Sequence, residues 1–437
     1  MNMTKKMIGL FCTAVLALGA FAEPTISIQR VQQRYPWNGF VDIDYTVSGV
    51  DEPANYFIKF TITTNGVSTG FAASEFLSSA TLLNASNGSY RVTWDSEYEQ
   101  EKFFAKNVSL KAQLMFGAGG DKSQCPYPEY MVIDLSAGSG EGATYPVTEG
   151  IYACTRLEAP ALFNSDQTYK TDKLALRRIK ATTFTMGSPT TEPGREPGTS
   201  FNKETQHPVT LTKDYFIGIF ELTQKQWKNV MGSVPGGQSA TGDALALAQV
   251  TYQDIRGSSD GCDASKLDSV ADGLAGAVDA TSFLGKLRDR TGIDTFDLPT
   301  DAQWENAARA KTTTSTYFGD VALDDDATLG LYCWYTKNAG GQIHEVGTRR
   351  QNWFGLYDML GNAYEWCRDR VKAAPKDDWG TDAVTDPLRK VFSGNVAARG
   401  GSWYNDSARL RSALRAGLYG VSNAYNYYGF RLSRTLP

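Results

Sequence analysis

The chain has 437 residues, of which 41% are hydrophobic and 21% charged, an ordinary composition for a globular protein of two or three domains. Its formal net charge is −5, its pI is about 5.3 and it has no run of lysines and arginines, so no nucleic-acid partner is expected. Glycine, with 42 residues, and aromatic residues, at 12%, favour strands and long loops over helical bundles.

Residues 1–22 are predicted to be a signal peptide. Lys5 and Lys6 precede an apolar run, and Ala20, Phe21 and Ala22 form the small-x-small pattern of a cleavage site. The run is short for a membrane-spanning helix, and no other stretch is long enough for one. We therefore expect no transmembrane segment, cleavage after Ala22 and an exported protein, periplasmic, on the cell surface or secreted. An uncleaved anchor is the alternative.

Five cysteines remain after such cleavage, and none of them belongs to a CxxC pair. A zinc ribbon or a thioredoxin-type site is therefore not expected. An odd number of cysteines in an exported protein leaves at least one free thiol or one intermolecular disulfide. Cys125 and Cys154 flank a predicted domain junction and are candidates for a disulfide, although the sequence does not fix the pairing.

Residues 24–136 are predicted to form a β-sandwich of the immunoglobulin-like (Ig-like) type. Hydrophobic and polar residues alternate there in short runs separated by Gly, Asn and Ser, which is typical of strands with one buried face. The predicted strands cover residues 41–47, 56–62, 90–94, 108–116 and 130–135. The segment shows no cluster of catalytic residue types, so we interpret it as an adhesive or spacer module.

A linker region is predicted over residues 137–178. It begins with a stretch rich in Gly and Ser, residues 136–146, which is typical of a flexible connection. Residues 147–178 fit either a linker or the first strand of the next domain, and the sequence leaves both interpretations open.

The last domain, residues 179–437, is expected to be α+β with much irregular backbone. Thr223 with Gln226, and Thr300 with Gln303, have the spacing of capping boxes at helix starts. Asp279 is a candidate cap for a third helix, which a glycine at position 292 would end. Gly-rich loops with many aromatic residues separate these helices.

Six blocks of this last domain follow one another in the order of a known family. They are FTMGSP from Phe184, HPVTL from His207, LPTDAQWENAARA from Leu298, VGTRRQNWFGLYDMLGNAYEW from Val346, ARGGSW from Ala398 and GFRLSR from Gly429. Together they resemble the formylglycine-generating enzyme, or sulfatase-modifying factor, family over about residues 180–437. The resemblance implies a C-type-lectin-like fold, and the β-sandwich lies outside it.

The resemblance also implies where the enzymes of this family keep their chemistry. Their copper(I)-binding cysteines, five positions apart after the GGS, fall on Asn405 and Leu410 of this chain. Copper(I) needs soft thiolate ligands, which neither residue supplies. The iron-dependent sulfoxide synthases of the same superfamily use three histidines, whereas this chain has His207 and His344. Copper and iron are therefore not expected, and whether the chain is an enzyme stays open.

A calcium-binding loop of the family has a counterpart in GLYDMLGNAYEW. The matching ligands are the side chains of Asp358 and Glu365 and the backbone carbonyls of Gly361 and Ala363. Calcium prefers carboxylate and carbonyl oxygens in a flexible shell. Calcium is thus the expected cofactor, and the alternative is that both carboxylates cap turns without a metal.

Polar and aromatic residues gather in two stretches near the end of the chain. We expect them to display a ligand-binding surface made of Tyr404, Asn405, Asp406, Tyr425, Asn426 and Tyr427. Tyrosine supplies large, stiff contact area, and asparagine supplies adaptable hydrogen bonds. The segment also resembles the mutable GGSW…GFR segment of variable proteins from diversity-generating retroelements. The predicted function is a module that binds a ligand or a protein partner, and the alternative is an enzyme of different chemistry in the same pocket.

Overall fold

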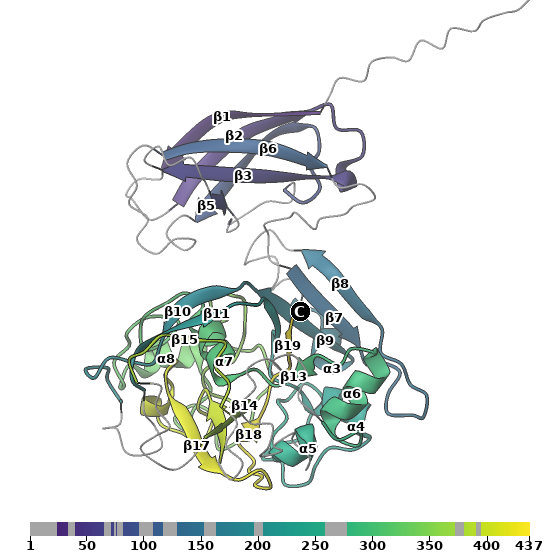
Figure 1. Ribbon diagram of the computed structural model, residues 1–437, viewed down its shortest axis with the longest axis vertical. Helices are drawn as coiled ribbons and strands as arrows, with labels where there is room; N and C mark the ends of the chain where they lie inside the picture. The colour runs from purple at the N-terminus through teal and green to yellow at the C-terminus, as the bar shows by residue number, and fades with distance from the viewer. Residues whose placement is uncertain are drawn as a thin grey trace, which may run out of the picture.

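The computed structural model has a smaller N-terminal and a larger C-terminal region, both rich in strands (Figure 1). It describes residues 24–33, 40–64, 71–73, 76, 82–95, 108–116, 129–152, 163–195, 204–257, 278–371, 380–389 and 395–437. The predicted signal peptide and the candidate disulfide of Cys125 and Cys154 lie outside the described residues. Within these ranges, none of the helices combines the length and the apolar character needed to cross a membrane. The α+β class is confirmed.

The N-terminal region is a β-sandwich of two three-stranded sheets. One sheet has the order β1-β2-β5, with strands β1 (Thr25–Gln33), β2 (Phe40–Ser48) and β5 (Gly88–Asp95). The other has the order β4-β3-β6, with strands β4 (Phe71–Ala73), β3 (Tyr56–Thr64) and β6 (Val108–Phe116), and the short 3-10 helix η1 (Pro53–Asn55) leads into β3. Every second residue of β2 is buried, because one face of the strand lies against the core.

The strand predicted at residues 130–135 belongs to the C-terminal region instead. β7 (Glu129–Asp134) pairs with β9 (Lys173–Ile179) on one side and with β8 (Val147–Tyr152) on the other. Residues 130–133 are all buried, so both faces of β7 are covered, unlike those of β2. The sandwich therefore ends before residue 129. Two parts of the predicted linker, β8 and the beginning of β9, belong to the C-terminal sheet, with the short helix α3 (Thr168–Thr171) between them in the chain.

The largest sheet of the C-terminal region has the order β13-β19-β12-β9-β7-β8. Its remaining strands are β12 (Tyr215–Gly218), β13 (Phe296–Asp297) and β19 (Ser433–Thr435). β19 lies between β13 and β12 and pairs with both, so the last residues of the chain are built into the interior of the sheet. Strands from both ends of the region thus share one sheet.

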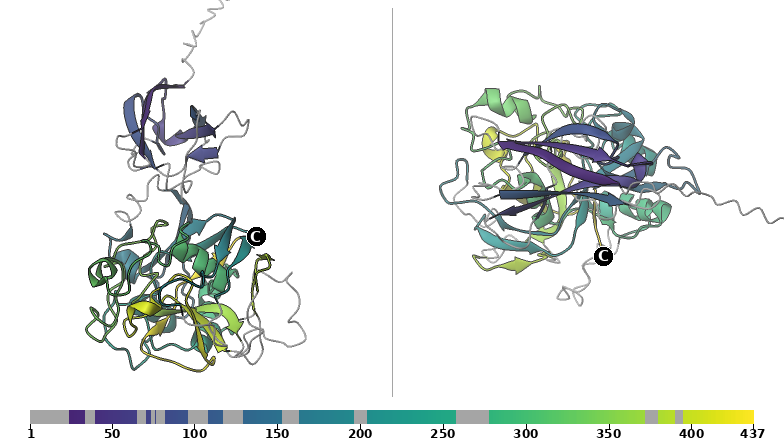
Figure 2. Two further views of the ribbon diagram at one scale, coloured as in Figure 1. Left: turned by 90° about the vertical axis from the view of Figure 1, so that its left-hand side faces the viewer. Right: turned by 90° about the horizontal axis from the view of Figure 1, so that it is seen from above.

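Two smaller sheets complete the C-terminal region. One has the order β17-β16-β14-β18, with β14 (Tyr364–Val371), β16 (Asn395–Arg399), β17 (Arg415–Tyr419) and β18 (Tyr428–Gly429). The other has the order β10-β11-β15, with β10 (Thr182–Met186), β11 (His207–Leu211) and β15 (Val384–Thr385). β17 and β18 lie at the opposite end of the region from β7 and β8 (Figures 1 and 2).

The helices of this region are α4 (Gln224–Met231), α5 (Tyr252–Arg256), α6 (Phe283–Thr291), α7 (Asp301–Arg309) and α8 (Asp326–Tyr332). Both predicted capping boxes are present, with Thr223 before α4 and Thr300 before α7. The cap of α6 is Ser282 rather than Asp279, because the Ser282 hydroxyl accepts the Gly285 N–H and the Asp279 carbonyl accepts from Ser282. Gly292 ends α6 in the left-handed conformation, as predicted.

Candidate functional site

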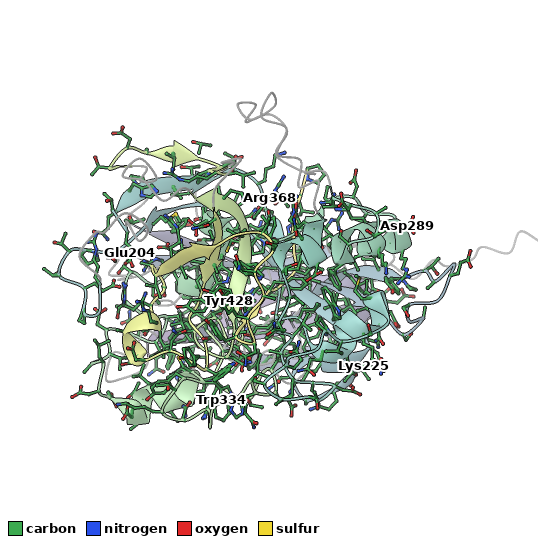
Figure 3. All side chains as sticks on the ribbon, turned by 90° about the horizontal axis from the view of Figure 1, so that it is seen from below. Glu204, Lys225, Asp289, Trp334, Arg368 and Tyr428 are labelled. Carbon is green, nitrogen blue, oxygen red and sulfur yellow. The ribbon has the colours of Figure 1, made fainter. Side chains whose placement is uncertain are left out.

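The two predicted ligand-binding stretches meet in one stack of tyrosine rings. Tyr404 lies nearly parallel to Tyr427, with 5.2 Å between the ring centroids and 14° between the planes, and Tyr425 stacks on Tyr427 at 5.5 Å. Tyr404 is 62% exposed, whereas Tyr425 and Tyr427 are half-buried. The cluster continues inward to the buried ring of Tyr428, which is labelled in Figure 3. The exposed ring is therefore supported from the core.

The backbone of both stretches is fixed by the surrounding frame. The indole N–H of Trp403 donates to the backbone carbonyl of Asn426 at 3.1 Å, so it ties one stretch to the other. The backbone N–H of Tyr364, on β14, donates to the carbonyl of Tyr427 at 2.9 Å. Irregular loops need such partners for their polar backbone groups. The tyrosines are thus presented on a backbone that is tied to a sheet.

Two glycines open the turn that carries Tyr404. Gly400 and Gly401 have φ angles of 94° and 75°, which glycine adopts without the strain that a Cβ would add. A Cβ on Gly400 would also lie 3.0 Å from the carbonyl oxygen of Met359 and 3.1 Å from the ring of Trp304. The GG of the GGSW motif is therefore a requirement of the turn and of its close packing.

Asn405 and Leu410, at the family's cysteine positions, have different surroundings. The side-chain oxygen of Asn405 accepts from the Ser402 hydroxyl at 2.7 Å, and its backbone carbonyl accepts the Thr336 N–H at 3.0 Å. Leu410 is buried in a hydrophobic cluster. Asp406 is exposed and precedes the 3-10 helix η5 (Ser407–Arg409). An uncharged amide and an acid therefore follow the exposed tyrosine, while Leu410 belongs to the frame.

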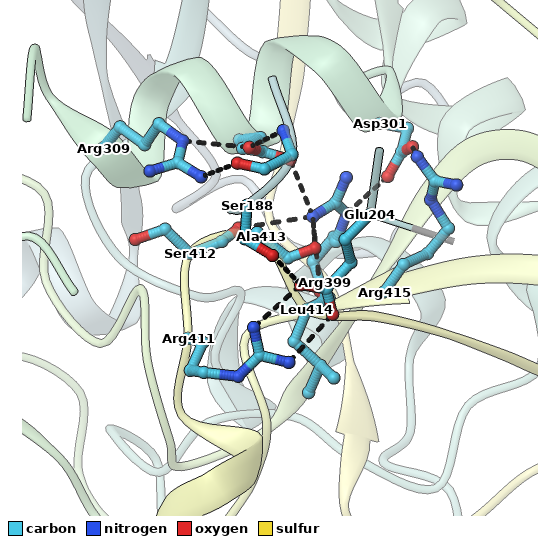
Figure 4. A network of polar contacts seen from close by, with 12 residues as sticks. Ser188, Glu204, Asp301, Arg309, Arg399, Arg411, Ser412, Ala413, Leu414 and Arg415 are labelled. Carbon is cyan, nitrogen blue, oxygen red and sulfur yellow. Dashed lines mark hydrogen bonds and ion pairs between the residues drawn. The ribbon is translucent and has the colours of Figure 1, made fainter. Parts of the chain in front are cut away.

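Buried ion pairs hold the segment that follows η5 (Figure 4). Arg411 donates to both carboxylate oxygens of Glu204 at 2.8 Å and to Glu192 at 2.6 Å. Burial opposes the ionisation of Glu204, but the Arg411 guanidinium outweighs it and lowers the pKa of that carboxyl. Arg399 donates to three successive backbone carbonyls, those of residues 412–414. This charged network fixes the backbone of residues 411–414.

Asp358 and Glu365, two of the predicted calcium ligands, are engaged with the chain itself. Asp358 is buried, and its carboxylate accepts the backbone N–H of Gly347 at 2.7 Å. Glu365 accepts from Arg431 through both oxygens at 2.6 Å, and from the indole N–H of Trp304 at 2.6 Å. A guanidinium that forms two parallel hydrogen bonds is a strong partner for a carboxylate. The chain therefore supplies its own cation to Glu365.

A third buried carboxylate, Glu221, contacts the same loop and was not predicted from the sequence. One of its oxygens accepts the Ala363 N–H at 2.9 Å and the other accepts the side-chain amide of Asn362 at 2.6 Å. Gly361 was predicted to offer its carbonyl to calcium. The N–H of the same residue donates to the Gly400 carbonyl. The sequence signal for Glu221 was an acid within the apolar run at residues 216–222, where a buried charge needs partners.

Three buried carboxylates, those of Asp358, Glu221 and Glu365, lie near the one guanidinium of Arg431. The cluster therefore holds more negative than positive side chains. Burial raises the pKa of Asp358 to about 6 against the lowering effects of the Gly347 N–H and of Arg431, and the Glu365 carboxylate adds a smaller increase. Burial, with Asp358 and Glu365 nearby, also raises the pKa of Glu221 well above its usual range. Such an excess is relieved by protons or by a bound cation.

The fit of these residues to calcium is therefore uneven. A calcium ion on Glu365 would lie next to the positive Arg431 guanidinium, which is unfavourable. Asp358 forms no such ion pair, and its raised pKa shows that its negative charge is less well stabilised. Within the described ranges, no three His, Cys, Asp or Glu side chains are arranged to hold a metal ion. Calcium binding stays a prediction, and Asp358 is the residue on which it depends.

The two histidines lie apart and contact backbone carbonyls. His207, on β11, is buried, and its Nδ1 lies 2.8 Å from the Thr205 carbonyl oxygen. His344 has its Nε2 2.8 Å from the Ala339 carbonyl oxygen, and its ring stacks on Trp334 at 3.7 Å. Burial lowers the pKa of His344 and so favours the neutral form of the ring that stacks on the indole. In this geometry both rings support the loops that carry them.

Comparison with known proteins relates this geometry to a family and to individual relatives. A family model described as "Sulfatase-modifying factor enzyme 1-like domain" matches residues 163–436. The chain is 30% identical over 198 residues to the chaperone protein LppX of Paenibacillus barcinonensis, which is 39% of this chain and 66% of that protein. It is 38% identical over 99 residues to the formylglycine-generating enzyme of Mycobacterium tuberculosis, which is 21% of this chain and 33% of that enzyme. Both matches span less than two thirds of the relative's length.

Two solved structures are similar to this chain over 60% of its length. Treponema denticola variable protein 1 is 24% identical, with a TM-score of 0.43, and 95% of that chain is covered. PvdO from Pseudomonas aeruginosa is 21% identical, with a TM-score of 0.47, and 94% of that chain is covered.

Proposed function

The chain belongs to the family of sulfatase-modifying factor enzyme 1-like domains, and from this premise we propose that it is an exported module that binds a ligand or partner. The assignment confirms the resemblance drawn from the six sequence blocks. At the positions of the family's copper ligands, this chain has a hydrogen-bonded amide, Asn405, and a buried leucine, Leu410. The fold is thus kept while the thiolates that copper(I) needs at these positions are replaced.

The exposure of Tyr404 on a supported stack is the observation that carries this proposal. A large aromatic ring that is 62% exposed contributes no core packing of its own, yet Tyr427 holds it in place. Rigid tyrosines flanked by asparagine and serine are typical of surfaces that recognise other molecules. The name of the Paenibacillus relative, a chaperone protein, is compatible with a role in binding a partner.

The test uses the full chain, labelled with a fluorophore, on cell-surface and extracellular material from the source organism. Wild type is expected to bind, and Tyr404→Ala to lose about tenfold or more in affinity, because exposed aromatic anchors carry much of the energy of such contacts. The free energy of unfolding of Tyr404→Ala, obtained from its melting curve, should stay within about 0.5 kcal/mol of the wild-type value. Leu331→Ala, at another exposed apolar residue, is the control and should bind normally. Equal binding by Tyr404→Ala would remove this surface as the site.

The purified chain is expected neither to convert the cysteine of a sulfatase-type peptide to formylglycine nor to retain copper(I) through dialysis. The reason is that Asn405 and Leu410 supply no thiolate at the family's copper positions. Mass spectrometry of the peptide and metal analysis of the protein check this. Formylglycine that rises in proportion to the protein and needs copper would contradict it.

Calcium is expected to raise the melting temperature of the C-terminal region. A ligand that binds only the folded state adds about 2.7 kcal/mol to the free energy of unfolding when its concentration is a hundred times its dissociation constant. Each kcal/mol raises the melting temperature of a region of this size by roughly 2–4 °C. Asp358→Asn should abolish the shift and is preferable to a change at Glu365, which would also unpair Arg431. Identical melting curves in chelator and in excess calcium would show that no such site exists.

A further inference from the structure

The free face of Tyr404 offers one aromatic platform of about the size of a single ring. Its other face lies against Tyr427, and Trp403 meets it at 83° with 5.7 Å between the ring centroids. With 62% of the residue exposed, the outer face is open to solvent. An aromatic face carries partial negative charge and attracts the weakly positive C–H groups of a ligand laid flat on it.

The two stretches that carry this platform are polar and almost uncharged. The stretches at residues 404–407 and 421–427 contain one charged residue, Asp406, which is exposed. Their other polar side chains are amides or hydroxyls: those of Asn405, Ser407, Ser422, Asn423 and Asn426, with the tyrosine hydroxyls. Of these, the Asn405 oxygen already accepts from Ser402 and the Ser407 hydroxyl already donates to the Leu323 carbonyl. Neither stretch has a lysine or an arginine, so phosphate, sulfate and uronate groups find no cation in them.

We infer that this surface, taken as the binding site proposed above, binds a neutral glycan. A pyranose ring presents C–H groups on a face that matches one tyrosine ring, and hydroxyls at its edge that match amides and hydroxyls. The inference rests on the proposed function and names its ligand class.

A protein partner is the competing occupant, and the exposed apolar surface argues against it. A stable protein interface buries about 800 Å² on each side and has an apolar core. Among the described residues, the large hydrophobic side chains that are exposed are Val31, Leu331, Trp353 and Tyr404. Tyr404 alone of these belongs to the stack, in which Tyr425 and Tyr427 are half-buried, so the face has one exposed ring. That suits a sugar ring better than the core of a protein interface.

Affinity electrophoresis of the full chain through gels containing polysaccharides tests the ligand class. The neutral polymers are pullulan, galactomannan and arabinoxylan, which all have vicinal diols, and alginate is the acidic comparison. We expect at least one neutral polymer to retard the wild type and alginate not to do so. Tyr404→Phe should keep the interaction, because it keeps the ring. Tyr404→Leu should lose at least about tenfold in affinity, because leucine has no flat ring on which a sugar can stack. A protein partner with an apolar pocket would still accept the leucine side chain.

Two results in these gels would overturn the inference: no retardation by any neutral polymer, or a Tyr404→Leu variant that is retarded like the wild type. A second experiment separates its failure from failure of the proposed function. The labelled chain is applied to the surface material after periodate, which cleaves vicinal diols of sugars, or after proteinase K. Binding lost after periodate and kept after proteinase K supports a glycan. The reverse pattern overturns the glycan and leaves the binding module intact, whereas no Tyr404-dependent binding to untreated material overturns the proposed function itself.

Discussion

Replacing Arg431 with methionine is expected to lower the free energy of unfolding of the C-terminal region by about 3–5 kcal/mol. Arg431 is fully buried and donates to both oxygens of Glu365 and to the backbone carbonyls of Gly218 and Tyr357. Methionine keeps much of the volume, but it leaves a buried carboxylate without its partner and two carbonyls without these donors. Urea unfolding in chelator, followed by tryptophan fluorescence, measures the loss.

Two further variants show whether this loss comes from the buried pair. Lys337→Met removes an ion pair with Asp326 in which both side chains are about half exposed and screened by water, so its cost should be much smaller than that of Arg431→Met. Arg431→Met combined with Glu365→Gln leaves neither charge alone, so its loss should be smaller than the sum of the two single losses. Strictly additive losses would contradict the view that the two residues act as one unit.

Asp358→Asn is expected to gain about 2 kcal/mol of stability relative to wild type, in chelator, when the pH rises from 4.5 to 7.5. The pKa of Asp358 is about 6 in the folded chain, against about 3.9 for an ordinary aspartate. The folded state therefore holds this proton more tightly than the unfolded state. Stability falls as the pH rises from about 4 through 6, and the penalty is complete above that range. Asparagine cannot ionise, and it keeps an acceptor for the Gly347 N–H.

Asp301→Asn provides a control without this pH dependence. Burial opposes the ionisation of Asp301, but Arg399 and Arg415 outweigh it and lower the pKa of that carboxyl. Its contribution to stability is present above the ordinary aspartate pKa and is lost only below it, so this variant should be destabilised by nearly the same amount at pH 4.5 and at pH 7.5. Unfolding in urea at both pH values measures the two differences. A difference between wild type and Asp358→Asn that did not change with pH would contradict a raised pKa at this site.

Excess calcium adds a further arm to the same measurement. If the ion binds Asp358, it takes the place of the proton there, because a metal ligand must be deprotonated. The advantage of Asp358→Asn over wild type at pH 7.5 should then shrink on addition of calcium. An advantage of unchanged size would separate the pH effect from any calcium site.

Several features of the fold were predictable because both partners are close in the sequence. The capping boxes at Thr223 and Thr300 need a residue three positions further on, and both are present as predicted. The alternation along β2 and β3 records the burial of one face of each strand, which any sandwich of these residues requires. The cap of α6 was placed wrongly at Asp279, because Ser282, three residues later, also has an oxygen that can cap a helix.

The sequence by itself determined the family, the local helix starts, the loss of the copper cysteines at Asn405 and Leu410, and the list of polar and aromatic residues near the end of the chain. Only the tertiary structure decided which of these meet. Arg431 pairs with Glu365, 66 residues earlier, and Tyr404 stacks on Tyr427. It also placed β7 in the sheet of β9 rather than in the sandwich. Local propensity depends on neighbours a few positions apart, whereas a buried charge or a stacked ring takes its partner from whatever the packed core brings near.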